Sequence, residues 1–330
     1  MATGPGSSFA PPNMLMLMGS DGRATRRSWE LALLGAATLG ALAMLAVLTR
    51  APAHASFPGG NGRIAFVRNG GLSTDTEEVF TMRADGSHRR RLTNNMAKDD
   101  DPAYSANGKR IAFESDRSGH RAIWSMDASG GRQRRLTGNS GGDLDQPAFS
   151  PSGRRIAFRD QSGAGARIDV ARSNGSHLRA LTARSINFDP NYSPSGKRIA
   201  FDSQRDGDPE IFVMRSDGAH ERRLTQNSTS DFGPDYSPNG KRIIFDSNRT
   251  GVSQIFVMRS DGTHERQLTH SPVSVFGASY SPNGKRIVFE TTAGGDTEIA
   301  VMRADGSHAH PLTNNSVDDH AASWQPKRRP

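Results

Sequence analysis

Short segments in which apolar and polar residues alternate recur along the chain, with Gly, Pro, Asn and Asp between them. In one such unit, the segment Arg242–Asp246 holds Ile-Ile-Phe, so both of its faces must be covered. The Asn239-Gly240 pair before it is a hairpin turn in which Gly adopts positive φ without a Cβ clash. The unit predicts four short antiparallel strands, the last polar and charged as an edge strand should be: Pro234–Ser237, Arg242–Asp246, Gln254–Met258 and Glu265–Thr269.

This unit is repeated at a nearly constant spacing. The Gly of its first turn recurs after 46, 45, 43, 44 and 44 residues, at Gly62, Gly108, Gly153, Gly196, Gly240 and Gly284. A Leu-Thr pair keeps the same spacing, at Leu92, Leu136, Leu181, Leu224, Leu268 and Leu312. An aromatic residue does so as well, at Tyr104, Phe149, Tyr192, Tyr236, Tyr280 and Trp324. Three markers in phase over six periods establish an internal repeat.

Four antiparallel strands in a repeat of this length are typical of β-propeller blades. An open β-solenoid is the alternative, but solenoids have shorter repeats, parallel stacking and caps. This chain instead has the means to close a ring, because the first unit lacks its own first strand and the last unit is followed by an extra one. We therefore predict an all-β, six-bladed propeller over residues 56–330. Residues 321–326 provide the inner strand of the first blade, and residues 63–93 provide its other three strands.

The first 55 residues have a different character. Residues 31–48 carry no charge and follow three Arg residues, which predicts export of the chain that follows. Ala53-His54-Ala55 is a small-x-small site at which a signal peptidase would cut before Ser56. The apolar run is longer than the ~7–15 residues usual in a signal peptide and short for a membrane span of ~17–25 residues. Residues 1–55 are thus predicted to be a disordered N-region with a cleaved signal peptide or a retained anchor, which places the propeller in the periplasm or at the cell surface.

The amino-acid composition limits which kinds of functional site and which kinds of binding partner the chain can have. The 330 residues include no Cys, which excludes disulfides, a thiol nucleophile and Cys-based zinc sites. The formal net charge of +8 attracts polyanions such as anionic lipid or acidic polymers. Because export removes the chain from nucleic acid, we do not expect a nucleic-acid partner, and we expect a monomer.

The repeat resembles the WD40-like (PD40) repeat of the TolB C-terminal propeller family, through the segments SPNGKRI, IFVMRSDG and RRLT. Asp101-Pro102 and Asp189-Pro190 match the family's Asp-Pro pair, whereas Asn239, Asn283, Ser152 and Ser195 replace its turn Asp. The resemblance covers residues 57–326. It implies the propeller fold, but TolB itself has an additional α/β domain before the propeller, and propeller peptidases have a hydrolase domain after it. Neither is seen here, so function does not follow from the resemblance.

Histidines at one repeat position are better interpreted as solvated turn residues than as metal ligands. They lie on different blades and therefore cannot converge on one ion: His88, His177, His220, His264 and His308.

Acidic residues gather where each outer strand leads to the next inner strand, which places them on one face, around the channel mouth. The candidate ligand-binding residues there are Asp99, Asp100, Asp145, Asp189, Asp231, Asp319 and His320. Convergent carboxylates suit Ca²⁺, which prefers ~6–8 oxygen ligands. The alternative is that each Asp binds the amides of its own loop, and the lack of an Asp-x-Asp-x-Asp-Gly loop favours it. No other cofactor is expected.

Basic residues follow the first turn of each blade and are predicted to share the opposite face. We expect that face to bind an anionic surface, although scattered Arg and Lys residues that only keep the propeller soluble are the competing interpretation. The candidates are Lys109, Arg110, Arg154, Arg155, Lys197, Arg198, Lys241, Arg242, Lys285 and Arg286.

No catalytic motif is present: there is no Walker loop, His-Glu-x-x-His or Ser nucleophile elbow. The sequence therefore predicts a non-catalytic propeller scaffold outside the cytoplasm that binds a protein segment or an envelope polymer. Two alternatives stay open. One is a metal-assisted polysaccharide lyase or hydrolase with its site at the channel mouth, and the other is the detached propeller of a peptidase system.

Overall fold

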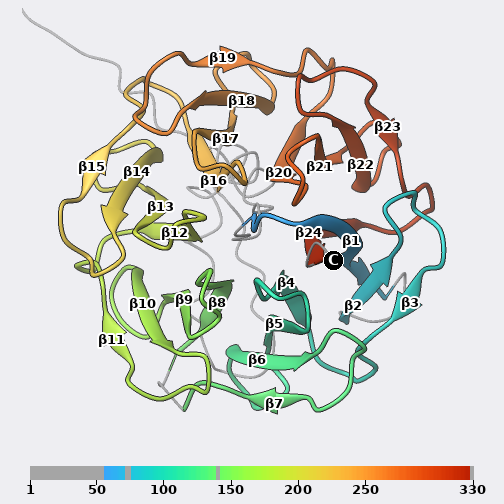
Figure 1. The fold of residues 1–330 in the computed structure, drawn as a ribbon, viewed down its shortest axis with the longest axis vertical. Helices are drawn as coiled ribbons and strands as arrows, with labels where there is room; N and C mark the ends of the chain where they lie inside the picture. Colours follow the sequence, from blue (N-terminus) through green and yellow to red (C-terminus); the bar gives the residue numbers. More distant parts are fainter. Residues whose placement is uncertain (1–55, 71–75, 139–141, 328–330) are drawn as a thin grey trace, which may run out of the picture. The chain divides into compact units, whose positions relative to one another are not determined.

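The computed structural model describes residues 56–70, 76–138 and 142–327, and its regular elements there are β-strands. These form four-stranded antiparallel sheets that surround a common axis, as the ring in Figure 1 shows. The inner strands are β24 (Asp319–Lys327), β4 (Asp99–Tyr104), β8 (Leu144–Phe149), β12 (Asn187–Tyr192), β16 (Asp231–Tyr236) and β20 (Val275–Tyr280). The second strands are β1 (Gly60–Asn69), β5 (Arg110–Ser115), β9 (Arg155–Asp160), β13 (Arg198–Ser203), β17 (Arg242–Ser247) and β21 (Arg286–Thr291).

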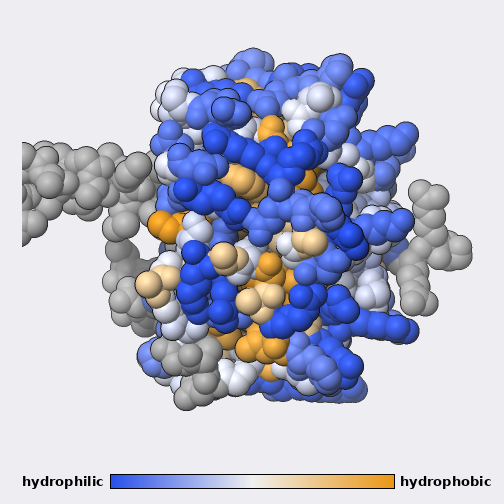
Figure 2. Space-filling model, turned by 90° about the vertical axis from the view of Figure 1, so that its left-hand side faces the viewer, coloured by the Kyte–Doolittle hydropathy of each residue, from blue (hydrophilic) through white to orange (hydrophobic). Residues whose placement is uncertain are grey.

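The outer half of each blade is shorter. The third strands are β2 (Glu77–Met82), β6 (Ala122–Asp127), β10 (Arg167–Arg172), β14 (Glu210–Arg215), β18 (Gln254–Arg259) and β22 (Glu298–Arg303). The outer strands have two residues each: β3 (Arg90–Arg91), β7 (Arg134–Arg135), β11 (Arg179–Ala180), β15 (Arg222–Arg223), β19 (Arg266–Gln267) and β23 (His310–Pro311). Such short, mostly charged strands leave little free edge for pairing with another chain. Figure 2 shows one side of this rim as mostly hydrophilic, with a smaller number of hydrophobic residues grouped near its middle.

The last strand closes the ring, as the sequence predicts. β24 pairs antiparallel with β1, and Trp324 lies opposite Ile64. The first blade thus has the strand order β24-β1-β2-β3, which joins the two ends of the repeat array. Trp324 is buried in a cluster that combines residues of the first and last blades. The prediction of a six-bladed propeller with four antiparallel strands per blade is confirmed.

Apolar residues of the second strands form the cores between neighbouring blades. Successive side chains of a strand point to opposite faces. In β17, Ile243 and Phe245 therefore pack against the blade before, while Ile244 packs against the blade after. This arrangement explains why the Ile-Ile-Phe segment is apolar on both faces, since each blade is covered on both sides.

The two ends of the ring differ in the loops that they hold. In blades two to six the turn after the inner strand binds the turn after the third strand, as when Ser260 N–H donates to the Lys241 carbonyl at 3.0 Å. The loop after each second strand binds the connection from the preceding blade, as when Asn248 N–H donates to the Ser230 carbonyl at 3.3 Å. We call the first end the basic face and the second the mouth.

The predicted N-terminal unit, residues 1–55, lies outside the described residues, and so does the apolar run 31–48. In the described part of the chain, no helix is long and apolar enough to cross a membrane.

Candidate binding site at the mouth of the ring

A β-bulge interrupts each inner strand close to the mouth. The pairing with the second strand shifts register between the second and fifth residues of the inner strand, for example between Phe232 and Asp235 of β16. The third residue has positive φ in every blade, from 48° to 64°, at Ala321, Asp101, Gln146, Asp189, Gly233 and Gly277. A residue other than Gly with positive φ is uncommon, and bulges often redirect groups beside functional sites.

In blades five, six and one the bulge turns a backbone N–H toward the preceding blade, where a buried acidic side chain accepts it. Gly277 N–H donates to Asp246 Oδ2 at 2.7 Å, and Ala321 N–H donates to Glu290 Oε1 at 2.8 Å. Burial raises the pKa of both Asp246 and Glu290 to about 8, because an ionised carboxylate is poorly solvated there. Asp246 and Glu290 were not among the residues predicted from the sequence. In the sequence they are marked only as acidic residues directly after the apolar run of a second strand.

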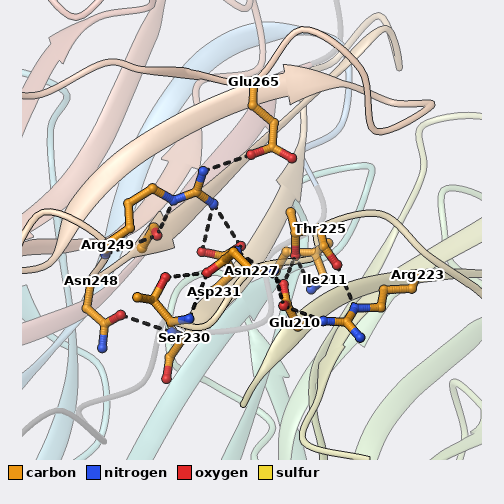
Figure 3. A network of polar contacts seen from close by, with 12 residues as sticks. Glu210, Ile211, Arg223, Thr225, Asn227, Ser230, Asp231, Asn248, Arg249 and Glu265 are labelled. Carbon is orange, nitrogen blue, oxygen red and sulfur yellow. Dashed lines mark hydrogen bonds and ion pairs between the residues drawn. The ribbon is translucent and has the colours of Figure 1, made fainter. Parts of the chain in front are cut away.

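The first residue of several inner strands is an aspartate that connects two blades. Figure 3 shows Asp231, whose Oδ2 accepts from Asn227 Nδ2 at 2.8 Å and from Arg249 Nη2 at 2.9 Å. Asn227 N–H also donates to Glu210 of the preceding blade at 2.7 Å, and Arg249 reaches Glu265 at 2.9 Å. The same arrangement recurs around Asp99, with Asn95 and Arg117, and around Asp319, with Asn315 and Arg68.

The predicted mouth residues differ in how deeply their side chains are buried and in what they bind. Asp99, Asp231 and Asp319 are fully buried. Their oxygens accept from an Asn of the connection that precedes the strand and from an Arg in or directly after the second strand of the same blade. Asp145 is likewise buried, with Arg159 Nε at 2.7 Å, and Asp189 is a buried bulge residue. The hydrogen bonds described for Asp99, Asp145, Asp231 and Asp319 come from Asn, Gln, Ser and Arg side chains, not from the loop amides that local capping would use. These contacts hold the strands at the mouth together.

Asp100 and His320 are the more accessible of the predicted mouth residues. Their side chains are 21% and 20% exposed, and His320 Nε2 lies 3.4 Å from Asp100 Oδ1. Burial disfavours the charge on His320, but Asp100, Glu290 and Glu77 outweigh it and raise the pKa of His320 to about 10. Burial also opposes the charge on Asp100, yet His320 holds the pKa of Asp100 below its usual range. The pair is therefore ionised at neutral pH.

The second residue of each inner strand divides the mouth into two halves. Because the inner strands surround the axis (Figure 1), these six residues form a ring. Blades one to three provide His320, Asp100 and Asp145, whereas blades four to six provide Phe188, Phe232 and Phe276. Phe232 is partly exposed, and the other two are 8% exposed. The mouth thus combines a charged half, in which Asp100 and His320 are the accessible members, with an aromatic half, in which Phe232 is the accessible member.

Two exposed aliphatic side chains lie on connections at the same end of the ring. Met96 precedes β4 and is 85% exposed, and Ile186 precedes β12 and is 42% exposed. Among the described residues, no group of three or more His, Asp and Glu side chains has the arrangement of a metal site.

The opposite face holds the predicted basic residues and the repeat histidines. Lys241 and Arg242 are exposed, as are the other basic candidates except Arg110, which is partly buried. Each repeat histidine ends a turn with positive φ, and His264 Nδ1 lies 3.0 Å from Thr263 Oγ1. A groove of about 990 Å³ opens on this face between blades five and six, lined by Tyr280, Lys241 and Arg242.

Comparison with known proteins identifies the family. The sequence matches the family described as the TolB beta propeller domain (PD40) over residues 34–186 and 146–329. The chain belongs to the TolB β-propeller family. A search of curated protein sequences gave no significant match.

Solved structures agree with this family. TolB from Acinetobacter baumannii is 24% identical with a TM-score of 0.73, covering 81% of this chain and 67% of that one. The putative TolB from Agrobacterium tumefaciens is 23% identical with a TM-score of 0.65, covering 80% and 92%. An oligogalacturonate lyase in complex with manganese is 12% identical with a TM-score of 0.51, covering 78% and 74%. At these identities the likeness shows a shared fold.

Proposed function

We propose that this TolB-family propeller is a non-catalytic scaffold that acts outside the cytoplasm and binds a polypeptide segment over the mouth of the ring. The observation that carries the proposal is the division of the mouth into a charged half and an aromatic half. A polypeptide offers backbone N–H and carbonyl groups for the charged half and apolar side chains for the aromatic half within one short segment.

The exposed residues of the connections favour a polypeptide over an envelope polysaccharide. Met96, before β4 in the charged half, and Ile186, before β12 at the start of the aromatic half, add exposed aliphatic groups to the mouth. Met is common at surfaces that adapt to several peptide partners, because its unbranched side chain changes shape easily. A sugar chain presents mainly hydroxyl groups and gains less from such contacts.

The inter-blade contacts make the mouth a rigid platform. Buried bonds such as those of Asp231 to Arg249 and Asn227 fix the start of an inner strand relative to two blades. A preformed site loses less entropy when it binds a flexible segment. The fully buried aspartates therefore support binding by holding the inner strands in place. Asp100, His320 and Phe232 are the residues expected to touch the segment.

The test compares binding of envelope polypeptides by matched variants. The exported protein is immobilised as wild type, as the double variant Met96→Ser/Ile186→Ser, and as Leu178→Ser. Leu178 is 53% exposed in the turn that precedes β11, on the basic face, and serves as the control. Retained polypeptides are quantified by mass spectrometry.

We expect at least one polypeptide whose retention falls about tenfold in the double variant, which corresponds to ~1.4 kcal/mol, and is unchanged in Leu178→Ser. Equal retention by all three proteins would contradict binding at the mouth.

On the basic face we propose contact with an anionic surface. The support is the shared exposure of Lys241, Arg242 and their counterparts in the other blades.

A further inference from the structure

The first described residues lie at the centre of the ring. In Figure 1 the blue start of the chain runs from the centre to β1. Phe57 is 3% exposed and packs in the cluster of blades two and three that includes Phe149. Ser56 is 4% exposed, and its Oγ lies 2.8 Å from the Tyr280 carbonyl oxygen of blade six. Two consecutive residues thus contact opposite sides of the ring.

Ser56 meets a buried carboxyl group there. Ser56 Oγ donates to Asp235 Oδ2 at 2.7 Å, and the Ser56 main-chain N–H also donates to Asp235. Asp235 further accepts from Tyr280 N–H at 2.7 Å and from Asn191 Nδ2 at 2.9 Å. Asp235 is 2% exposed, and each of these partners is neutral. A carboxylate buried among neutral groups is costly, and burial raises the pKa of Asp235 to about 8.

The propeller fold does not require a carboxyl group at this position. The equivalent fifth residue of the other inner strands is small or neutral: Ala103, Ala148, Asn191, Ser279 and Ser323. In the described part of the chain, the side-chain hydrogen bonds of Ser56 go to Asp235 and to the Tyr280 carbonyl. The presence of a carboxyl group at Asp235 is therefore best explained by the Ser56 nitrogen that lies beside it.

The predicted signal-peptidase site ends at Ala55. Hydrolysis of the Ala55–Ser56 bond adds the hydroxyl of water to the Ala55 carbonyl carbon and leaves an amine on Ser56. At neutral pH that amine is largely protonated, since an α-amino group has a usual pKa of ~7.7–8.0. The Ser56 nitrogen that donates to Asp235 as a neutral amide thereby becomes a cation.

We propose that the chain is cut between Ala55 and Ser56, and that the α-ammonium group of Ser56 forms a buried ion pair with Asp235 at the centre of the ring. This inference rests on the proposed export, and it selects the cleaved signal peptide over the retained anchor. The new charge neutralises the buried carboxylate, and the new N-terminus becomes part of ring closure. Because Ser56 is buried in the folded ring, cleavage precedes the closing of the centre.

A double-mutant cycle tests the ion pair directly. Residues 56–327 hold all four strands of every blade, so the chain 56–330 contains the complete closed ring. It is prepared with a free Ser56 amine, by removing a fusion partner without leaving extra residues, and with the same amine acetylated. Each form is made with Asp235 and with Asp235→Asn, and the unfolding equilibrium constant is measured in urea at neutral pH.

The substitution should have opposite effects in the two forms. With the free amine, Asp235→Asn removes half of a buried ion pair and raises the unfolding constant by roughly 100-fold. With the acetylated amine, the same substitution removes an uncompensated carboxyl group and lowers the unfolding constant. Asp217→Asn, at an exposed turn, is the control and should act equally in both forms. Equal effects of Asp235→Asn in the two forms would overturn the ion pair.

The processing is tested separately on the full-length chain. After expression in a host that exports it, the N-terminus of the protein recovered from the envelope is sequenced. We expect Ser56 as the first residue. A chain that is recovered from the envelope with residues 1–55 intact would overturn the processing, while the binding proposed at the mouth would still stand. Failure to reach the envelope would instead overturn the export on which both proposals rest.

Discussion

Replacing Asp246 by Asn should make the propeller more stable at neutral pH, and the size of the gain should depend on pH. Asp246 lies in β17, is 3% exposed, and accepts the bulge N–H of Gly277 through Oδ2. Its Oδ1 has no hydrogen-bond partner among the described residues. An amide keeps the acceptor for Gly277 and removes the ionisable group, so Asp246→Asn isolates the cost of the charge.

The sign and size of this pH-dependent stability difference follow from the raised pKa of Asp246 in the folded state. The Asp246 carboxyl has a pKa of about 8 in the folded state, against ~3.9 in the unfolded chain. Between these values the unfolded state releases the proton and the folded state keeps it, so stability falls as pH rises. The slope is at most ~1.36 kcal/mol per pH unit. From pH 5 to pH 7 the wild type should therefore lose up to ~2.7 kcal/mol that Asp246→Asn does not lose.

Urea unfolding at several pH values, followed by tryptophan fluorescence, measures this difference. The urea dependence of the unfolding free energy should stay the same in both proteins, because the surface exposed on unfolding is unchanged. Asp261→Asn, at an exposed turn, is the control and should show no such pH-dependent gain. If the gain in Asp246→Asn is the same at pH 5 and pH 7, or if the variant is less stable at pH 7, the assigned burial cost is wrong.

Three further predictions concern closure, the mouth and the basic face. Deleting residues 319–330 removes β24 and should abolish cooperative unfolding, and Trp324→Ala alone should cost ~3–5 kcal/mol; a truncated chain that melts like the full one would contradict closure. If the mouth carboxylates bind a metal, millimolar Ca²⁺, Mn²⁺ or Zn²⁺ should raise the melting temperature. With Asp99, Asp231 and Asp319 already bound by neighbouring side chains we expect no shift, and a clear one would favour a metal-dependent enzyme instead. Residues 56–330 should sediment with anionic but not with neutral liposomes. They should detach as salt rises from about 50 to 300 mM, because salt screens the attraction between the basic face and the anionic headgroups. Sedimentation that ignores lipid charge and salt would refute that contact.

Most of the fold could be predicted from sequence because its determinants are local. The turn at Asn239-Gly240 and the apolar segment Arg242–Asp246 recur in every repeat and define the hairpins. Residues 321–326 have the sequence of an inner strand but follow the last complete repeat, and this was enough to predict that they close the ring. The division into a mouth and a basic face followed from strand direction alone.

The candidate site could be predicted only in part, because its contacts join residues of different strands and loops, and in places of different blades. The buried aspartates were visible in sequence, but the Arg249 that binds Asp231 comes from the loop after the next strand. Positive φ at Ala321 has no local signal, since alanine does not favour it; the N–H bond to Glu290 of the neighbouring blade accompanies it there. The contact of Ser56 with Asp235 spans 179 residues and depends on the closed ring.

The claim that the mouth is the binding face is tested most directly by site-specific photo-crosslinking in the native envelope. A photoreactive amino acid replaces Met96 at the mouth or Leu178 on the basic face, and both positions are exposed. After irradiation, adducts are identified by mass spectrometry. The proposal predicts a defined polypeptide adduct from position 96 that is absent from position 178. Equal labelling from both positions, or an adduct from position 178 alone, would contradict it.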